Sequence, residues 1–186
     1  MPDNFWTSSA ARDPKRAFRF TVFFTNIDGG IIWYAKSVTK PKISFGEAEH
    51  NFLNHKFYYP GRAEWDPVTL TLVDPVTPDA AGNLLSLIAD TGYALPAGVA
   101  SLVAGRGLSS PSKQSSVDAL GEIIFNQIDQ EGNPIETWTL NNAWIKDLAF
   151  GEMDYSSDDL IELTMTLRYD WASFSSPEIP TLFIPQ

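Results

Sequence analysis

Residues 160–172, LIELTMTLRYDWA, show the clearest pattern in the chain. Two sets of side chains alternate along this stretch. One set is apolar: Ile161, Leu163, Met165, Leu167 and Tyr169. The other set is mostly polar: Leu160, Glu162, Thr164, Thr166 and Arg168. An alternation with a period of two predicts a strand that is buried on one face and solvated on the other. We therefore expect one long strand from Leu160 to Trp171.

The same period recurs outward from this stretch. It predicts shorter strands at 18–24, 31–38, 43–49, 68–72, 122–128, 137–143 and 145–150. Turns are expected at Asp28–Gly30, at Pro60-Gly61 and at Glu131–Asn133. One helix is expected at about residues 79–92, capped by Thr77 or Asp79. Adjacent strands joined by tight turns predict a mainly β fold, an antiparallel sandwich or barrel with one flanking α-helix.

The length of 186 residues suits one domain with arms. We expect a polar N-terminal arm at 1–14 and a β domain at 15–172. A loop rich in Gly, Ser, Ala and Pro interrupts the domain at 93–117, and an extended C-terminal tail follows at 173–186. The uncharged stretch 91–105 contains Pro96 and several glycines, and the N-terminus has no apolar signal segment. The expectation is a soluble protein made in the cytoplasm, without a membrane anchor.

Composition excludes several kinds of chemistry. The chain has no cysteine, so disulfides, thiol nucleophiles and cysteine-based metal sites are excluded. The formal net charge is −10, which does not suit a protein that grips a phosphate backbone. Hydrophobic residues make up 44% and charged residues 19% of the chain, which is typical of a globular protein.

No convincing catalytic or cofactor site is found in the sequence. His50 and His55 lie in a segment with strand-like alternation, and an odd spacing of five predicts opposite faces and no metal site. Asp154, Asp158 and Asp159 form an acidic cluster that could in principle hydrolyse glycosides. A turn stabilised by its own side chains is the better interpretation. We expect no enzyme activity and no cofactor.

Two longer segments carry a family resemblance. Residues 138–172 contain Asn142-Ala143-Trp144 and the ending RYDWA, and residues 42–75 contain a hairpin followed by the strand WDPVTLTL, Trp65 to Leu72. In this order they resemble the tail tube protein of contractile-tailed bacteriophages. That family is related to the ring protein of type VI secretion and to tube proteins of contractile injection systems.

The resemblance implies two sheets packed at an angle, and hexameric rings of the chain that stack into a tube. It implies a structural subunit of a virion tail, assembled in the host cytoplasm, through which DNA passes without specific binding. Sheath, baseplate, tape-measure and tail terminator proteins are the implied partners. Two alternatives stay open: the tube of a phage-derived contractile injection system, and a carbohydrate-binding β-sandwich that uses exposed tryptophans.

Three sets of residues are predicted to take part in assembly. The hairpin 43–61 is expected to contact the next ring, unless its side chains pack in the subunit's own core: Phe52, Leu53, Phe57, Tyr58 and Tyr59. Polar residues are expected to line the channel: Glu47, Glu49, Glu122, Asn126 and Gln127. Apolar terminal anchors are expected to dock on a neighbour or fold back: Phe5, Trp6, Leu182, Phe183 and Ile184.

Overall fold

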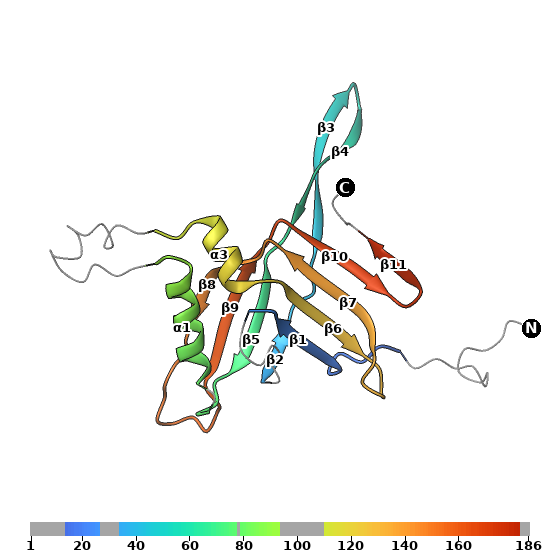
Figure 1. The fold of residues 1–186 in the computed structure, drawn as a ribbon. Coiled ribbons are helices and arrows are strands. Elements are labelled where there is room, and N and C mark those ends of the chain that lie inside the picture. The colour runs from blue at the N-terminus through green and yellow to red at the C-terminus, as the bar shows by residue number, and fades with distance from the viewer. Residues whose placement is uncertain (1–13, 27–33, 78, 94–109, 183–186) are drawn as a thin grey trace, which may run out of the picture.

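In the described part of the chain, two antiparallel sheets and a long hairpin form the fold, and two helices lie along one side (Figure 1). The structure is a computed structural model that describes residues 14–26, 34–77, 79–93 and 110–182. The five-stranded sheet has the order β1 (Phe20–Phe24), β6 (Ile123–Ile128), β7 (Pro134–Asn141), β10 (Trp171–Ser176) and β11 (Ile179–Leu182). The four-stranded sheet has the order β2 (Ala35–Val38), β5 (Val68–Val73), β9 (Glu162–Arg168) and β8 (Trp144–Ala149). The hairpin pairs β3 (Ile43–Phe52) with β4 (His55–Trp65).

Alternating apolar side chains of both sheets form one core. In β9 the buried residues are Leu163, Met165 and Leu167, which are fully inaccessible to solvent. The central strand β5 and the strand β6 of the other sheet bury every second residue in the same way. The predicted mainly β fold of two packed sheets is therefore confirmed, as is the face that this part of the chain turns inward.

The chain changes from one sheet to the other at two corners, and this corrects the single strand predicted over 160–171. β9 ends at Arg168, and after Tyr169 and Asp170 the chain re-enters the other sheet as β10. The second corner lies at Asn142-Ala143, between β7 and β8. In the sequence the apolar alternation of 161–169 runs on to Trp171, whereas in the structure the buried face shifts from Tyr169 to Ala172, so sequence periodicity alone does not reveal this corner.

Asp170 ties the two corners together. Its backbone N–H donates to the carbonyl of Asn141 at 3.1 Å. Its carboxylate accepts a hydrogen bond from Asn142 Nδ2 at 2.9 Å and pairs with Lys113 at 2.6 Å. Asn142 adopts φ +54°, a left-handed conformation that asparagine tolerates better than most residues.

The structure contains a second helix that was not predicted. α1 (Ala80–Asp90) confirms the expected helix, and Asp79 caps it by accepting from Gly82 N at 2.9 Å. α3 (Lys113–Leu120) begins within the stretch predicted to be a loop. Ser112 and Ser115 cap it reciprocally, and only Leu120 of this helix is buried. A single buried residue gives almost no periodic signal, which is why the sequence pattern missed the helix.

The C-terminal segment belongs to the sheet, which corrects the extended tail predicted from residue 173. β10 pairs with β7 through Ser175, and β11 turns back to pair with β10. Leu182 lies opposite Phe174 in this last pair. The described part of this end therefore folds back on its own domain, whereas Phe183 and Ile184 lie outside the described residues, as do Phe5 and Trp6.

The predicted turn at Pro60-Gly61 is also wrong. Both residues lie inside β4, and the hairpin turns at Leu53-Asn54, where Leu53 has φ +50°. The pairing of β3 with β4 is irregular between Phe45 and Glu47. There a Cβ on Gly61 would lie 2.9 Å from the backbone carbonyl of Gly46. Glycine is required at this position because the two backbones approach each other closely.

We predict that Asp170→Ala lowers the free energy of unfolding by about 1 kcal/mol, because it removes a hydrogen bond and an ion pair from the corners. Urea denaturation measures the change. Asp170→Asn should have a smaller effect, because the amide oxygen can still accept from Asn142. Asp158→Ala, in an exposed loop, is the control; an equal loss in that variant would contradict a special role for the corner.

Candidate assembly surfaces

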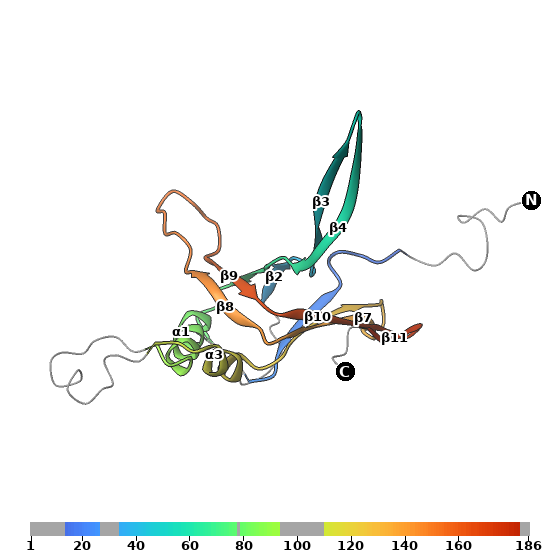
Figure 2. The same cartoon turned by 90° about the horizontal axis from the view of Figure 1, so that it is seen from above.

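The β3–β4 hairpin stands clear of both sheets (Figures 1 and 2). All five side chains predicted to contact another ring lie in it and are exposed, from 48% for Phe57 to 88% for Leu53. The alternative, that they pack in the subunit's own core, is therefore wrong. A contiguous group of large exposed apolar side chains is typical of an interaction surface.

The strand register divides the outer part of the hairpin into two unlike faces. In an antiparallel pair, directly opposite residues share a face. His50 lies opposite Phe57, Phe52 opposite His55 and Ala48 opposite Tyr59. We call this the aromatic face: Ala48, His50, Phe52, His55, Phe57 and Tyr59. The residues between them form the charged face: Glu47, Glu49, Asn51, Lys56 and Tyr58.

This register corrects the prediction that the two histidines lie on opposite faces. The odd spacing between His50 and His55 would separate them in one continuous strand. The chain reverses at Leu53-Asn54, so the histidines belong to different strands and share the aromatic face. Tyr58, in contrast, lies on the charged face, apart from the other predicted contact residues.

A buried carboxylate, Glu136, holds the segment that leads into the hairpin. It lies on the inward face of β7 with 6% of its surface exposed. It pairs with Lys40, just before β3, at 2.5 Å and with Lys15 at 2.6 Å, and it accepts from Trp138 Nε1 at 2.6 Å. Burial raises the pKa of Glu136, but these three hydrogen bonds outweigh burial and lower the pKa to about 2. Its two lysine partners are distant in sequence, so no local motif could have identified the site.

The base of the hairpin is also closed by polar and aromatic contacts. Lys42 pairs with Asp66 at 2.8 Å, and Asp66 N donates to the Lys42 carbonyl at 2.9 Å. The ring of Trp65 lies 6.1 Å from that of Tyr169 in the core. Burial, followed by the charge of Asp66, raises the pKa of Tyr169 to about 12. The hairpin is thus fixed in direction although its outer part touches neither sheet.

The outward face of the five-stranded sheet is uncharged over the paired residues of β1, β6, β7 and β10 that run from Thr21 in β1 to Trp171 in β10. Its residues are Thr21, Phe23, Ile124, Asn126, Thr137, Thr139, Asn141, Trp171, Ser173 and Ser175. Thr137 donates to Asn126 at 2.8 Å, and Asn141 donates to Ser173 at 2.8 Å. This face is rich in hydroxyl and amide groups and uncharged, although the chain has a formal net charge of −10.

The predicted channel residues do not share one surface. Asn126 lies on the outward face, and the exposed Glu122 precedes β6 with the same parity. Gln127 points inward, is 8% exposed and donates to the carbonyls of Arg16 at 2.6 Å and Arg19 at 2.8 Å. Gln127 must therefore be removed from the predicted set. Glu47 and Glu49 lie on the charged face of the hairpin.

The two edges of the five-stranded sheet are β1 and β11. β1 has the sequence FTVFF, without charge, proline or irregular pairing. The edges of the other sheet are blunted by charge, because β2 contains Lys36 and β8 contains the pair Lys146–Asp147. An uncharged edge strand is a template for pairing with another strand. The five-stranded sheet is therefore the sheet whose edge strand, β1, is better suited to pair with a further strand.

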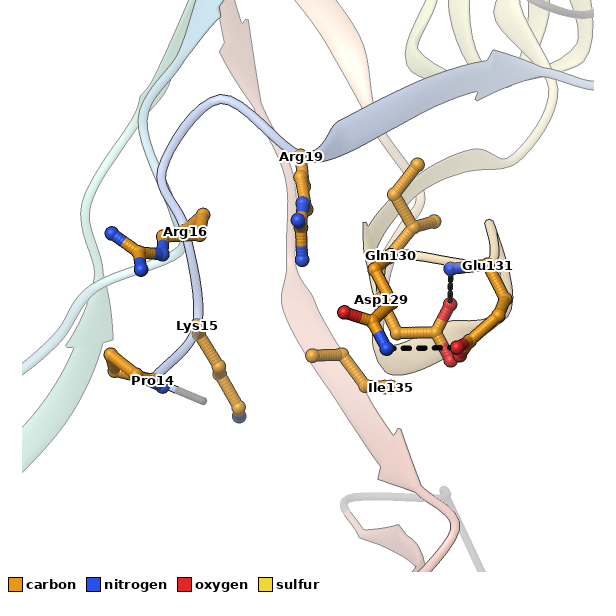
Figure 3. A pocket seen from close by; sticks show the side chains of 9 residues that line it. Pro14, Lys15, Arg16, Arg19, Asp129, Gln130, Glu131 and Ile135 are labelled. Atoms are coloured by element: carbon orange, nitrogen blue, oxygen red, sulfur yellow. Dashed lines mark hydrogen bonds between the residues drawn. The ribbon is translucent and has the colours of Figure 1, made fainter. Parts of the chain in front are cut away.

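A cavity of about 450 Å³ lies between the segment before β1 and the β6–β7 turn (Figure 3). Arg16 and Arg19 form one side, and Asp129 and Glu131 lie on the other. Asp129 accepts from the backbone N–H of Asn133 at 2.8 Å and of Glu131 at 2.9 Å. The bond from Asn133 is the main cause of its lowered pKa. This carboxylate stabilises its own turn, and no arrangement of acid and base for catalysis is present in the cavity.

The acidic loop between β8 and β9 is a turn held by its own side chains, as predicted. Asp154 accepts from the backbone and the hydroxyl of Ser156, both at 2.9 Å, and these bonds lower its pKa. Ser157 donates to Asp159 at 3.0 Å. Among the described residues, no group of three or more His, Asp or Glu side chains could hold a metal ion. Within the same part of the chain, no helix is long and apolar enough to cross a membrane.

The tryptophans that the structure describes are all partly buried and engaged in packing. Trp138 contacts Phe174 with the ring centroids 4.9 Å apart, and Trp65 contacts Tyr169. Trp171 buries its Nε1, and Trp144 lines an apolar groove beside α1. These four rings do not form an exposed platform on which sugars could stack.

Comparison with known proteins places the fold. No protein-family model and no curated protein matches the chain. The solved structures that are similar to it include three determined by cryo-EM. A chain of an extracellular contractile injection system, the PVC sheath–tube complex in the extended state, has a TM-score of 0.64 and 20% identity, covering 91% of this chain and 99% of that one. A chain of the PVC sheath/tube terminator has a TM-score of 0.65 and 20% identity, covering 90% and 100%.

A chain of the anti-feeding prophage tube terminating cap has a TM-score of 0.63 and 18% identity, covering 92% of this chain and 97% of that one. At these identities the likeness shows the fold alone. The resemblance inferred from the sequence is thereby confirmed at the level of the fold.

We predict that Glu136→Gln lowers the free energy of unfolding at neutral pH by about 2 kcal/mol, because Lys15 and Lys40 lose a buried partner. The folded pKa lies below the ordinary value of 4.5, so the stabilisation is present above that pH and is lost as the pH falls toward about 2. The difference between wild type and variant should therefore shrink over this range in denaturant titrations. Glu64→Gln, on the exposed hairpin, is the control, and a pH-independent difference would contradict the role of the charge.

Proposed function

We propose that this chain is the subunit of a tube in a contractile injection apparatus, where it forms hexameric rings that stack. The observation that carries the proposal is the free-standing hairpin with its exposed aromatic face, on a fold shared with chains of sheath–tube complexes. A monomer gains nothing from such a surface, whereas a stacked assembly buries it. The role is structural and requires no catalysis.

Ring closure is proposed to use the edges of the five-stranded sheet. The uncharged β1 of one subunit and the β11 side of the next can extend the sheet between them. A head-to-tail contact of this kind closes when the rotation between subunits divides the circle evenly. Closure removes the open edges that make a free sheet prone to aggregation.

Stacking is proposed to use the hairpin, and the channel is proposed to be lined by the outward face of the five-stranded sheet with Glu122 and Asn126. Glu47 and Glu49 would reach the channel from the charged face of the hairpin where rings meet. The terminal anchors Phe5, Trp6, Phe183 and Ile184 are proposed to dock on neighbouring subunits; this proposal concerns residues outside the described ranges. A face of hydroxyl and amide groups offers a passing cargo no ionic attachment.

The implied partners are a sheath, a baseplate and a tube terminator, because the similar solved chains come from such complexes. A tape-measure protein is proposed from the family resemblance alone. The tail tube of a contractile phage, ejecting DNA from a virion, is the second candidate. The solved structures favour the injection apparatus, since they come from PVC and the anti-feeding prophage. The carbohydrate-binding alternative is disfavoured by the packing of the described tryptophans.

We predict that replacing Phe52 and Leu53 together by serine leaves folded subunits or single rings and abolishes tubes, because two exposed apolar contacts are lost at every stacking junction. Sedimentation and negative-stain microscopy measure tube formation, and circular dichroism checks the fold. Val76→Ser is the matched control, since Val76 is 97% exposed and lies after β5, outside the hairpin. Full-length tubes from the double variant would refute the stacking role.

The absence of native cysteine allows the channel face to be mapped by labelling. We predict that Asn126→Cys in assembled tubes reacts with a small maleimide but not with one carrying a large polyethylene glycol chain. Asp158→Cys, in the exposed β8–β9 loop, should react with both. The unassembled Phe52/Leu53 variant carrying Asn126→Cys shows whether the site reacts at all when it is open. Equal labelling of Asn126→Cys by both reagents in tubes would place this face outside the channel.

A further inference from the structure

The aromatic face of the hairpin contains both histidines of the chain. We propose that this face is a proton-sensitive docking surface for a second copy of the chain, which holds stacked subunits together while His50 and His55 are neutral and releases them when they are protonated. The inference rests on the proposed stacking role of the hairpin and adds to it a control by pH.

The two histidines lie among the contact residues and not beside them. Each is directly opposite a phenylalanine in the register, His50 opposite Phe57 and His55 opposite Phe52. Directly opposite side chains in an antiparallel pair have Cβ atoms only about 5 Å apart. A partner that covers either phenylalanine must therefore also cover the neighbouring imidazole.

No carboxylate of the hairpin's described residues shares this face with the imidazoles in its outer part. Glu47 and Glu49 point to the charged face, where Glu49 pairs with Lys56 at 3.0 Å. Arg62 and Glu64 lie nearer the base, beyond the irregular pairing at Gly61. Figure 2 shows the outer hairpin standing clear of both sheets, so within the described part of the chain no other element packs against the two histidines.

Burying a charged group without a partner is far costlier than burying a neutral one. A neutral imidazole can enter an aromatic interface with its hydrogen bonds satisfied at the rim, whereas an imidazolium resists removal from water. Histidine changes charge near pH 6.5 in water, so the switch falls within the range of ordinary biological pH changes. Each subunit contributes one hairpin to the contact between two rings, so this contact contains several copies of both histidines. Separation of the rings is then coupled to the uptake of several protons, and tube disassembly should depend steeply on pH.

Because of their position in the outer hairpin, protonation of the two histidines does not destabilise the fold of the subunit. Both histidines are exposed in the subunit, and the core and the base of the hairpin contain neither. Protonation therefore acts on the contact between subunits and leaves each subunit folded. Disassembly at low pH should be reversible for this reason.

The experiment compares assembled tubes of wild type and of the double variant His50→Gln/His55→Gln. Tubes formed at about pH 7.5 are titrated to about pH 5, and the fraction that sediments is measured. Wild-type tubes should dissolve with a midpoint near pH 6, and the double variant should dissolve at least about one pH unit lower or not at all. Each single variant should lie between them, and return to about pH 7.5 should restore wild-type tubes.

The charged face provides the matched control, because Glu49→Gln removes a titratable group from the same hairpin and should leave the midpoint near pH 6 unchanged. An identical midpoint in the double histidine variant would overturn the inference, as would wild-type tubes that become more stable in acid. Loss of far-UV circular dichroism at the midpoint would also overturn it, since the subunit would then be unfolding. If wild type forms no tubes at about pH 7.5, the proposed function itself fails, which distinguishes the two results.

Discussion

Everything in this domain depends on two corners at which the chain passes from one sheet to the other. β7 becomes β8 at Asn142-Ala143, and β9 becomes β10 at Tyr169-Asp170. Because both corners are joined through Asp170, the inward faces of the two sheets are held over the same core. Ala143, Tyr169 and Ala172 are buried where the sheets meet. The corners join β8 and β9 of the four-stranded sheet to the inner strands β7 and β10 of the five-stranded sheet, so the edge strand β1 and the outward faces stay available to neighbours.

The exposed hairpin is stable because its base, and not its outer part, is bound to the domain. Glu136 fixes the segment before β3, the pair Lys42–Asp66 closes the base, and Trp65 packs on Tyr169. The outer part then carries large apolar side chains at little conformational cost to the subunit, since they are not needed for its core. Rigid attachment also reduces the entropy lost when such a surface binds a partner.

The excess negative charge of the chain is distributed unevenly over the surface of the subunit. Each lysine of the described residues pairs with a carboxylate: Lys15, Lys36, Lys40, Lys42, Lys56, Lys113 and Lys146. The excess carboxylates remain on loops and on the charged face of the hairpin, while the outward face of the five-stranded sheet has none between Thr21 and Trp171. A negative net charge therefore does not by itself place negative charge on every surface of the subunit. The distribution of charge over surfaces is a property of the register, not of the composition.

The sequence by itself determined the mainly β fold, most strands, the helix α1 and the group of assembly candidates in residues 52–59, because each leaves a local signal in periodicity, capping or aromatic density. Only the tertiary structure decided where the long strand of 160–171 breaks, because Trp171 continues the apolar alternation in the sequence although the buried face moves to Ala172. It also decided that Gln127 is buried, that His50 and His55 share a face, and that residues 173–182 complete a sheet. Each of these depends on which residue lies opposite which, and a shift of one residue reverses every face. Glu136 had no signal at all, since its partners Lys15 and Lys40 are brought to it by the packing of distant segments.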